Sequence, residues 1–327
     1  MSADDTAGAS ALGHVPIMPD VVAHELITDP NGIYLDATIG AGGHAEVILS
    51  HLHKEGHLIG LDRDPEAVRR CTVNLRAYAD RLTLIHADYR SLAAVLRDAG
   101  VAQITGALFD LGLSSPQLDD PERGFSYRFD SPLDLRFDRT TGQSAAAWLA
   151  SASEREIARV LREYGEERHA ARLARLIVEE RHFTPVTTTR TLVGLVERAA
   201  GQSGPSFGRS AARVFQALRI VVNDELAAIP VGIRAAMDRL APGGRIVVLA
   251  YHSLEDRLVK TLFREASRPC RCSPAQGQCI CGADPQGRVV HRHVIRPTDD
   301  ETRRNRRAAA ARLRVFERDT QRDGGAS

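Results

Sequence analysis

The sequence predicts an α/β fold in which a doubly wound, parallel sheet is interrupted by an inserted helical domain. Short apolar runs alternate with helical stretches from Gly32 to about Pro116, whereas the pattern from Leu118 to Arg213 is helical throughout. A further apolar run follows at 245–251. Strands that alternate with helices form a parallel sheet covered on both faces. We therefore expect a sheet domain in two parts, residues 14–117 and 213–318. The helical insertion between them spans residues 118–212. The ends, residues 1–13 and 319–327, are expected to be flexible.

The elements of the sheet domain follow from these runs. Strands are expected at residues 32–36, 57–62, 82–86, 106–110 and 245–251. Helices are expected where apolar residues recur at helical spacing, and Pro65 suits the first turn of one of them. The expected helices are residues 44–51, 65–78, 91–99, 153–164 and 169–180, with one or two more within 213–240.

Composition excludes several classes of protein. The 327 residues are 43% hydrophobic and 26% charged, which is enough for a buried core and excludes disorder of the whole chain. The formal charge is only +1, so contact with a polyanion requires a local patch. No apolar run approaches the roughly 18 residues of a membrane span, and the polar, acidic start is unlike a signal peptide. We expect a cytoplasmic protein that does not bind membranes.

A glycine-rich loop, Asp36-Ala-Thr-Ile-Gly-Ala-Gly-Gly-His44, follows the first predicted strand. Glycines let the backbone approach a ligand closely, and the next helix offers N–H groups at its start. Asp62 ends the second strand, where a carboxylate can bind a ribose diol. Gly40, Gly42 and Ala45 also match the dinucleotide-binding spacing. However, Asp36 would repel a pyrophosphate and attract a sulfonium, so the loop favours S-adenosylmethionine over NAD.

The fourth predicted strand ends in Asp110-Leu-Gly-Leu-Ser-Ser-Pro-Gln117, at the sheet edge where ligands of doubly wound folds bind. The exocyclic amine of a nucleobase is a poor nucleophile because its lone pair is delocalised into the ring. A hydrogen-bond acceptor aimed at the amine restores lone-pair character, and alignment with a methyl group supplies much of the remaining rate. The candidate catalytic acceptors are Asp110, Ser114 and Ser115. The alternative is that Asp110 only caps the next helix.

These motifs resemble the motif series of the RsmH (MraW) family, in order and at compatible spacing over about residues 14–315. The resemblance implies a class I (Rossmann-like) methyltransferase fold with a helical substrate-recognition insertion. It also implies S-adenosylmethionine-dependent methylation of N4 of a cytidine in the decoding centre (P-site region) of 16S ribosomal RNA. The matching motifs are Asp36-Ala-Thr-Ile-Gly-Ala-Gly-Gly-His44, Asp62-Arg-Asp-Pro65, Asp110-Leu-Gly-Leu-Ser-Ser-Pro-Gln-Leu-Asp119, Arg123-Gly-Phe-Ser126, Tyr164-Gly-Glu-Glu-Arg168, Phe215-Gln-Ala-Leu-Arg-Ile220, Leu240-Ala-Pro-Gly-Gly-Arg245 and His252-Ser-Leu-Glu-Asp-Arg257.

The resemblance also implies a set of site residues. It places the cofactor contacts on Gly42, Gly43, His44, Asp62, Tyr89, Asp110 and Gln117. Tyr89 stands where the family has phenylalanine, and its ring can still pack near the adenine.

His252, which follows the last strand, is a further catalytic candidate: it could relay the released proton or provide an orienting hydrogen bond. Phe125, Tyr127 and Tyr251 are candidates for stacking on an unstacked base.

The C-terminal segment is rich in arginine. Residues 288–318 hold ten arginines and four acidic residues, a density typical of a patch that faces phosphates. We expect this patch and the inserted helices to hold RNA of the small ribosomal subunit. The alternative is a solvated helix over residues 301–312.

Four of the five cysteines cluster as C-x-C-x6-C-x-C: Cys270, Cys272, Cys279 and Cys281. Four thiolates at this spacing could form a tetrahedral structural zinc site. Thiols without a metal, or a disordered loop at 266–288, are the alternatives. Cys71 stands alone in a predicted helix and is expected in the core.

Three other functions remain open from the sequence. An NAD-dependent oxidoreductase could use the same glycine loop. A non-catalytic RNA chaperone could keep the same fold. A methyltransferase could also act on DNA or on another RNA, because only the family resemblance specifies the nucleotide.

Overall fold

The computed structural model describes residues 16–201, 205–270, 272 and 285–320. The chain forms two compact units: unit 1 is Met1–Gly112 with Ala228–Ser327, and unit 2 is Leu113–Ala227. Unit 2 extends beyond the expected limit at residue 212 because helix α10 (Pro205–Asn223) packs on helices of the insertion. No helix of the described residues is long and apolar enough to cross a membrane.

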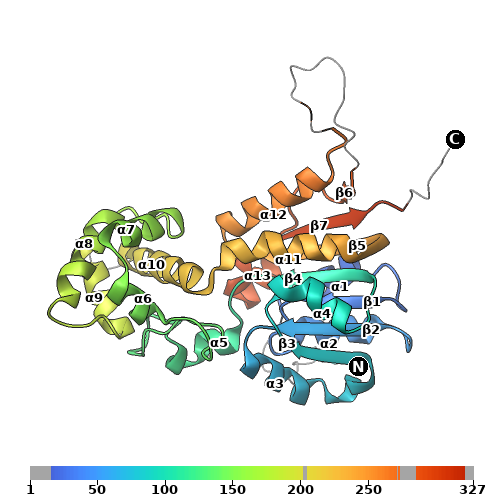
Figure 1. Cartoon of the computed structure of the whole chain (residues 1–327), viewed down its shortest axis with the longest axis horizontal. Helices are drawn as coiled ribbons and strands as arrows, with labels where there is room; N and C mark the ends of the chain where they lie inside the picture. The colour runs from blue at the N-terminus through green and yellow to red at the C-terminus, as the bar shows by residue number, and fades with distance from the viewer. Residues whose placement is uncertain (1–15, 202–204, 271, 273–284, 321–327) are drawn as a thin grey trace, which may run out of the picture. The chain divides into compact units, whose positions relative to one another are not determined.

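Unit 1 contains a seven-stranded sheet with the order β3-β2-β1-β4-β5-β7-β6 (Figure 1). The first five strands are parallel, and β7 runs antiparallel to both β5 and β6. The doubly wound sheet predicted from the sequence is confirmed, and β2 and β3 have the expected bounds. The strands are β1 (Ile33–Asp36), β2 (His57–Asp62), β3 (Leu82–His86), β4 (Ile104–Asp110), β5 (Leu240–Ala250), β6 (Gly287–Val289) and β7 (Arg312–Arg318).

The strands β6 and β7 were not predicted. A continuous helix over residues 301–312, the alternative considered for this segment, is wrong: α13 ends at Arg304, a 3₁₀ turn spans Arg306–Ala310, and β7 begins at Arg312. Within β7, Leu313 and Val315 are buried and alternate with arginines. This is the period-2 pattern of a strand, which the density of arginine concealed.

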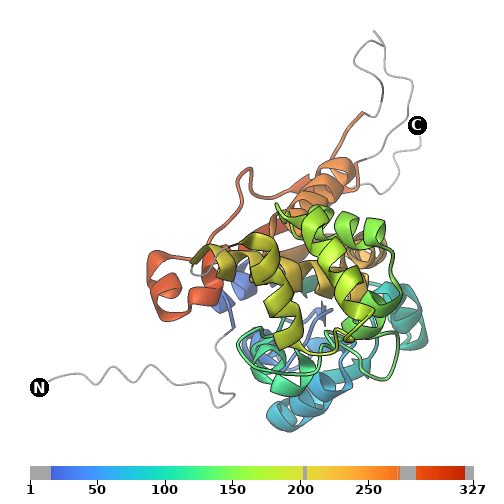
Figure 2. The same ribbon diagram turned by 90° about the vertical axis from the view of Figure 1, so that its left-hand side faces the viewer.

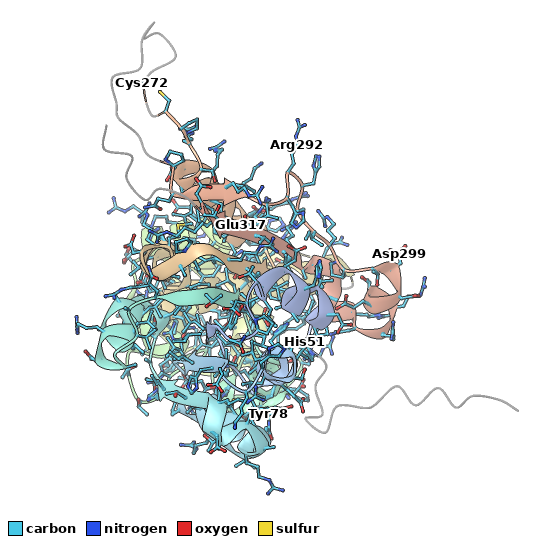
Figure 3. The ribbon with its side chains drawn as sticks, turned by 90° about the vertical axis from the view of Figure 1, so that its right-hand side faces the viewer. His51, Tyr78, Cys272, Arg292, Asp299 and Glu317 are labelled. Atoms are coloured by element: carbon cyan, nitrogen blue, oxygen red, sulfur yellow. The ribbon has the colours of Figure 1, made fainter. Side chains whose placement is uncertain are left out.

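The helices of unit 1 pack around this sheet. An apolar cluster joins α1 and α2 to β1, β4, β5 and the segment before β7. In Figure 3, His51 of α2 and Asp299 of α13 accordingly lie toward the same side of the sheet. Asp64 caps α3 by accepting from the amide of Glu66, and Pro65 occupies the first turn as expected. The helices are α1 (Pro19–Leu26), α2 (Gly43–His51), α3 (Pro65–Asn74), α4 (Leu92–Asp98), α11 (Glu225–Arg239), α12 (Ser253–Ala266) and α13 (Asp299–Arg304).

Unit 2 is helical and has its own core, with its helices drawn in green and yellow in Figure 2. Phe125 is only 5% exposed and stacks on Phe137, with ring centroids 5.6 Å apart. The expectation that Phe125 stacks on an RNA base is therefore wrong, because this ring fills the core. Tyr127 is partly buried and packs edge-on against Phe215. The helices are α5 (Ser115–Asp119), α6 (Ala145–Ser151), α7 (Glu154–Glu163), α8 (Ala170–Arg181), α9 (Thr189–Ala200) and α10.

Candidate active site

Three aspartates meet where the strand order reverses. Asp36, Asp62 and Asp110 are the last residues of β1, β2 and β4. The chain goes from β1 to β2 and β3 on one side, and β4 and β5 lie on the other. Ligands of open α/β sheets bind at this point, outside the carboxyl ends of the strands. The sequence placed all three carboxylates there, and the structure brings them together.

The glycine loop turns sharply from β1 into α2. Gly40 and Gly42 have φ of 53° and 95°, in the left-handed region. A Cβ atom on Gly42 would lie 2.9 Å from Cδ1 of Leu75 and 3.1 Å from Sγ of Cys71. Gly43 begins α2, and the amides of the first turn of a helix have no partner within the helix and can bind a ligand. Only glycine fits the conformation and the space at position 42.

Asp62 fixes this loop from the neighbouring strand. Its Oδ2 accepts a 2.9 Å hydrogen bond from the amide of Gly40, and its Oδ1 accepts one of 2.8 Å from the amide of Asp64. Burial raises the pKa of Asp62 to about 6. Each carboxylate oxygen can accept a second bond. Asp62 can therefore hold the loop and bind a ribose diol at the same time.

Asp36 is linked to Asp110 through Thr38. The Thr38 hydroxyl accepts a 2.7 Å hydrogen bond from the amide of Asp110 and lies 3.5 Å from Oδ1 of Asp36, to which it donates. Asp36 is only 1% exposed. Burial raises its pKa to about 7; His44 opposes this rise, and Asp110 and Asp62 add to it. The site is rich in carboxylates and suits a cationic ligand.

The raised pKa of Asp36 predicts how the stability of the ligand-free protein depends on pH. The carboxyl binds a proton more tightly in the folded than in the unfolded state. Its contribution to the free energy of unfolding is therefore complete below about pH 4 and is lost as pH rises through 7. Asp36→Asn is expected to remove this dependence. The difference in free energy of unfolding between the wild type and the variant should change by on the order of 4 kcal/mol between pH 4 and 8. Urea unfolding across this range measures it, and a constant difference would contradict the assignment.

Asp110 is held between two side chains. Its Oδ1 accepts a 2.6 Å hydrogen bond from the Tyr251 hydroxyl, and its Oδ2 lies 3.4 Å from Nδ1 of His44. His44 is 7% exposed, and its Nε2 lies 2.9 Å from the carbonyl oxygen of Ile17. A carbonyl only accepts, so Nε2 carries a hydrogen and donates it. The Asp110 side chain stays 26% exposed and can accept a hydrogen bond from a ligand amine.

Tyr89 begins a short 3₁₀ turn after β3. Its ring meets Phe109 of β4 edge-on, with centroids 5.7 Å apart. A Cβ atom on Gly232 would lie 2.5 Å from Cδ2 of Tyr89, so α11 needs glycine where it passes the ring. The neighbours of Tyr89 thus hold its ring near the carboxyl ends of β3 and β4; its packing on adenine stays a prediction.

Ser114 and Gln117 belong to unit 2, where they cap α5. Oε1 of Gln117 accepts a 3.1 Å hydrogen bond from the amide of Ser114, and Gln117 is 8% exposed. Ser115 is the first residue of α5, and its side chain lies outside the described part. The predicted roles of these three side chains toward a ligand stay predictions.

His252 caps helix α12. Its Nδ1 accepts from the amide of Glu255 at 3.4 Å, and its Nε2 lies 2.9 Å from Oε1 of the same residue. Both ring nitrogens therefore face Glu255. The orienting role and the proton relay of His252 both stay predictions.

The cysteine cluster gains no support as a metal centre. Cys279 and Cys281 lie outside the described residues, and the amide of Cys272 donates to Sγ of Cys270 at 3.4 Å. Within the described ranges, no group of three His, Cys, Asp or Glu side chains could hold a metal ion. Cys71 is fully buried in the core as expected, and burial raises its pKa to about 12.

The arginines of residues 288–318 have two different roles. Three of those on the strands bind other groups of the protein: Arg314 pairs with Asp256 at 2.6 Å, Arg288 pairs with Glu317, and Arg318 donates to the carbonyl of Leu240. The residues between β6 and β7, 290–311, form what we call the basic connector. Figure 3 shows Arg292 of this connector pointing away from the sheet. Its other exposed arginines are Arg296, Arg303, Arg304, Arg306 and Arg307.

Two groups of the site were missed by sequence reasoning. Thr38 lies in the glycine-rich loop motif, two residues after Asp36. A hydroxyl at this position, next to the ends of β1 and β4, was a signal that it could bond to both strands. The Ile17 carbonyl, which orients His44, had no signal, because a backbone group leaves no trace in residue type.

Comparison with known proteins shows which family this chain is similar to. A model of the MraW methylase family matches residues 11–319. The ribosomal RNA small subunit methyltransferase H of Heliobacterium modesticaldum is 44% identical over 310 residues, which cover 93% of this chain and 98% of that protein. The protein of the same description from Thermobifida fusca is 45% identical over 324 residues, covering 97% of each chain.

Proposed function

Because the chain belongs to the MraW methylase family, we propose that it transfers a methyl group from S-adenosylmethionine to N4 of a cytidine in the decoding centre (P-site region) of 16S ribosomal RNA. The observation that carries the chemistry is the placement of Asp110 beside the glycine loop, between Tyr251 and His44. The target nucleotide follows from the family resemblance. An assembled small subunit or its RNA is the partner, which places the enzyme in the cytoplasm.

The residues fit this donor. S-adenosylmethionine, when bound, supplies an electrophilic methyl group on a sulfonium cation. The Gly42–His44 turn is suited to its methionine part, Asp62 to its ribose and Tyr89 to its adenine. Three clustered carboxylates favour a cation and disfavour the pyrophosphate of NAD, so the oxidoreductase alternative is the weaker one.

Asp110 acts on the nucleophile. Its carboxylate accepts a hydrogen bond from the N4 amine, which directs the nitrogen lone pair toward the methyl carbon. The N–C bond forms as the C–S bond breaks, and the electron pair of that bond stays on sulfur. The methylated nitrogen then loses a proton to Asp110 or, through it, to water. Most of the rate comes from this alignment.

The experiment is methyl transfer to small subunits from cells that lack this protein. Methyl-labelled S-adenosylmethionine and the purified chain should introduce one N4-methylcytidine, located by mass mapping of the digested 16S RNA. Methylation at another atom or in another nucleic acid would contradict the proposed target. Binding of NAD without binding of S-adenosylmethionine would favour the oxidoreductase.

The basic connector is proposed to bind RNA phosphates. Arg304→Ala with Arg306→Ala is expected to raise KM for RNA and to leave kcat unchanged. The slope of log KM against log salt should fall by about 0.7–0.9 for each phosphate that the variant no longer neutralises. Arg97→Ala, which removes an exposed arginine of α4 paired with Asp98, is the control. Equal slopes for the wild type and the double variant would exclude phosphate binding by these two arginines.

A further inference from the structure

Tyr251 follows β5 and lies next to the end of β4. Asp110 pairs with Leu249 in the register of β4 and β5, and the Tyr251 hydroxyl donates to Oδ1 of Asp110 at 2.6 Å. A hydroxyl–carboxylate bond of this length is charge-assisted and stronger than a bond between neutral groups. The sequence suggested Tyr251 only as a stacking ring, whereas the structure directs its hydroxyl to the reactive carboxylate.

Tyr251 is held firmly in this position. Its amide donates at 2.8 Å to Oε2 of Glu255, a residue of α12 that is 1% exposed. Its ring covers Gly112, where a Cβ atom would lie 3.3 Å from Cδ2 of the ring. Gly112 also has a φ of 111°, which favours glycine. The backbone of Tyr251 is thus held by Glu255, its ring packs on Gly112, and its hydroxyl is held by Asp110.

The Tyr251 hydroxyl can only donate to this carboxylate. Burial and the charge of Asp110 raise the pKa of Tyr251 well above its ordinary value, with smaller contributions from Glu255 and Glu301. The phenol therefore stays protonated in any practical assay. The other groups facing Asp110 are His44, whose Nδ1 lies 3.4 Å from Oδ2, and Asp36, whose pKa burial raises to about 7.

We propose that Tyr251 is a positioning residue for methyl transfer, which holds the Asp110 carboxylate in one orientation by donating to Oδ1. The terminal torsion of aspartate is broad and nearly two-fold, so one fixed oxygen prevents rotation. Oδ2 is then kept toward His44. This inference rests on the proposed function, in which Asp110 receives the N4 amine.

Tyr251→Phe keeps the ring and removes only the hydroxyl. We expect kcat to fall about tenfold, the effect of one hydrogen bond, with KM for RNA unchanged. The acidic limb of the pH profile should move to higher pH, because the charged carboxylate loses a donor. Tyr34→Phe is the matched control. Tyr34 is fully buried, and its hydroxyl donates to the carbonyl of Asp29. Loss of this hydroxyl should lower the free energy of unfolding and leave kcat and KM unchanged.

A second measurement needs neither cofactor nor RNA. Carbon-13 NMR of aspartate carboxyl groups, with Asp110→Asn to assign the signal, follows the titration of Asp110 in the ligand-free protein. The midpoint should rise in Tyr251→Phe and stay constant in Tyr34→Phe. 3-Fluorotyrosine at position 251 is a stronger donor and should lower the midpoint, which provides a test even if the phenylalanine variant does not fold.

The outcomes separate the two proposals. A Tyr251→Phe variant with the kcat, pH profile and Asp110 titration of the wild type would overturn the positioning role while leaving N4 methylation intact. A wild type that methylates no cytidine N4 would overturn the proposed function. The carboxyl titration would still show whether Tyr251 controls Asp110.

Discussion

Asp110→Asn is expected to lower kcat for methyl transfer about a thousandfold, within the range for loss of a positioned acid–base group. The Tyr251 hydroxyl donates to Oδ1 and should bind the amide oxygen of the new side chain. The amide nitrogen then takes the place of Oδ2 and presents hydrogens where the substrate amine needs an acceptor. The measurement is single-turnover methyl transfer, which excludes effects on product release.

The matched control for this prediction is Asp98→Asn in α4, a side chain that is 71% exposed. It makes the same change of charge on the protein surface and should keep full activity. Calorimetry with S-adenosylhomocysteine shows whether Asp110→Asn retains the ligand site. An Asp110→Asn rate within threefold of the wild type would show that this carboxylate is only a structural cap.

Gly42→Ala is expected to lower the free energy of unfolding by about 3 kcal/mol and to weaken S-adenosylhomocysteine binding more than thirtyfold. Alanine at a φ of 95° costs about 1–2 kcal/mol, and its Cβ would lie 2.9 Å from Leu75, which adds an overpacking cost of about 1–3 kcal/mol. Urea unfolding and calorimetry measure the two effects.

Gly100→Ala separates conformational strain from crowding. Gly100 also has a positive φ, of 70°, but nothing lies within 4 Å of a Cβ atom there. The variant should lose only about 1 kcal/mol of stability and no affinity for the ligand. Equal losses in the two variants would mean that the space beside Leu75 is unimportant.

Much of unit 1 could be predicted from the sequence because its signals are local. Each of the first four strands ends near a polar residue, and parallel strands bring their carboxyl ends to one edge. Asp36, Asp62 and Asp110 could therefore be assigned to one site. The strands β6 and β7 could not, because the arginines of β7 concealed its period-2 pattern, and its pairing with β5 joins residues 62 to 72 positions apart, such as Arg245 and Glu317.

The aromatic candidates show the same limit. Phe125, Tyr127 and Tyr251 were indistinguishable as rings in the sequence. In the structure, Phe125 fills the core of unit 2, and the hydroxyl of Tyr251 reaches Asp110. Exposure and direction of a side chain depend on the elements packed around it, which residue type alone does not report.

The sequence by itself determined the first five strands, the helices between the first four of them, the glycine turn and the identity of the acidic groups, because backbone preference and residue chemistry act over a few neighbouring positions. Only the tertiary structure decided which oxygen of Asp110 meets Tyr251, which nitrogen of His44 is committed to Ile17, and which arginines are exposed. These contacts join segments far apart in the chain, so their distances exist only after the sheet has assembled.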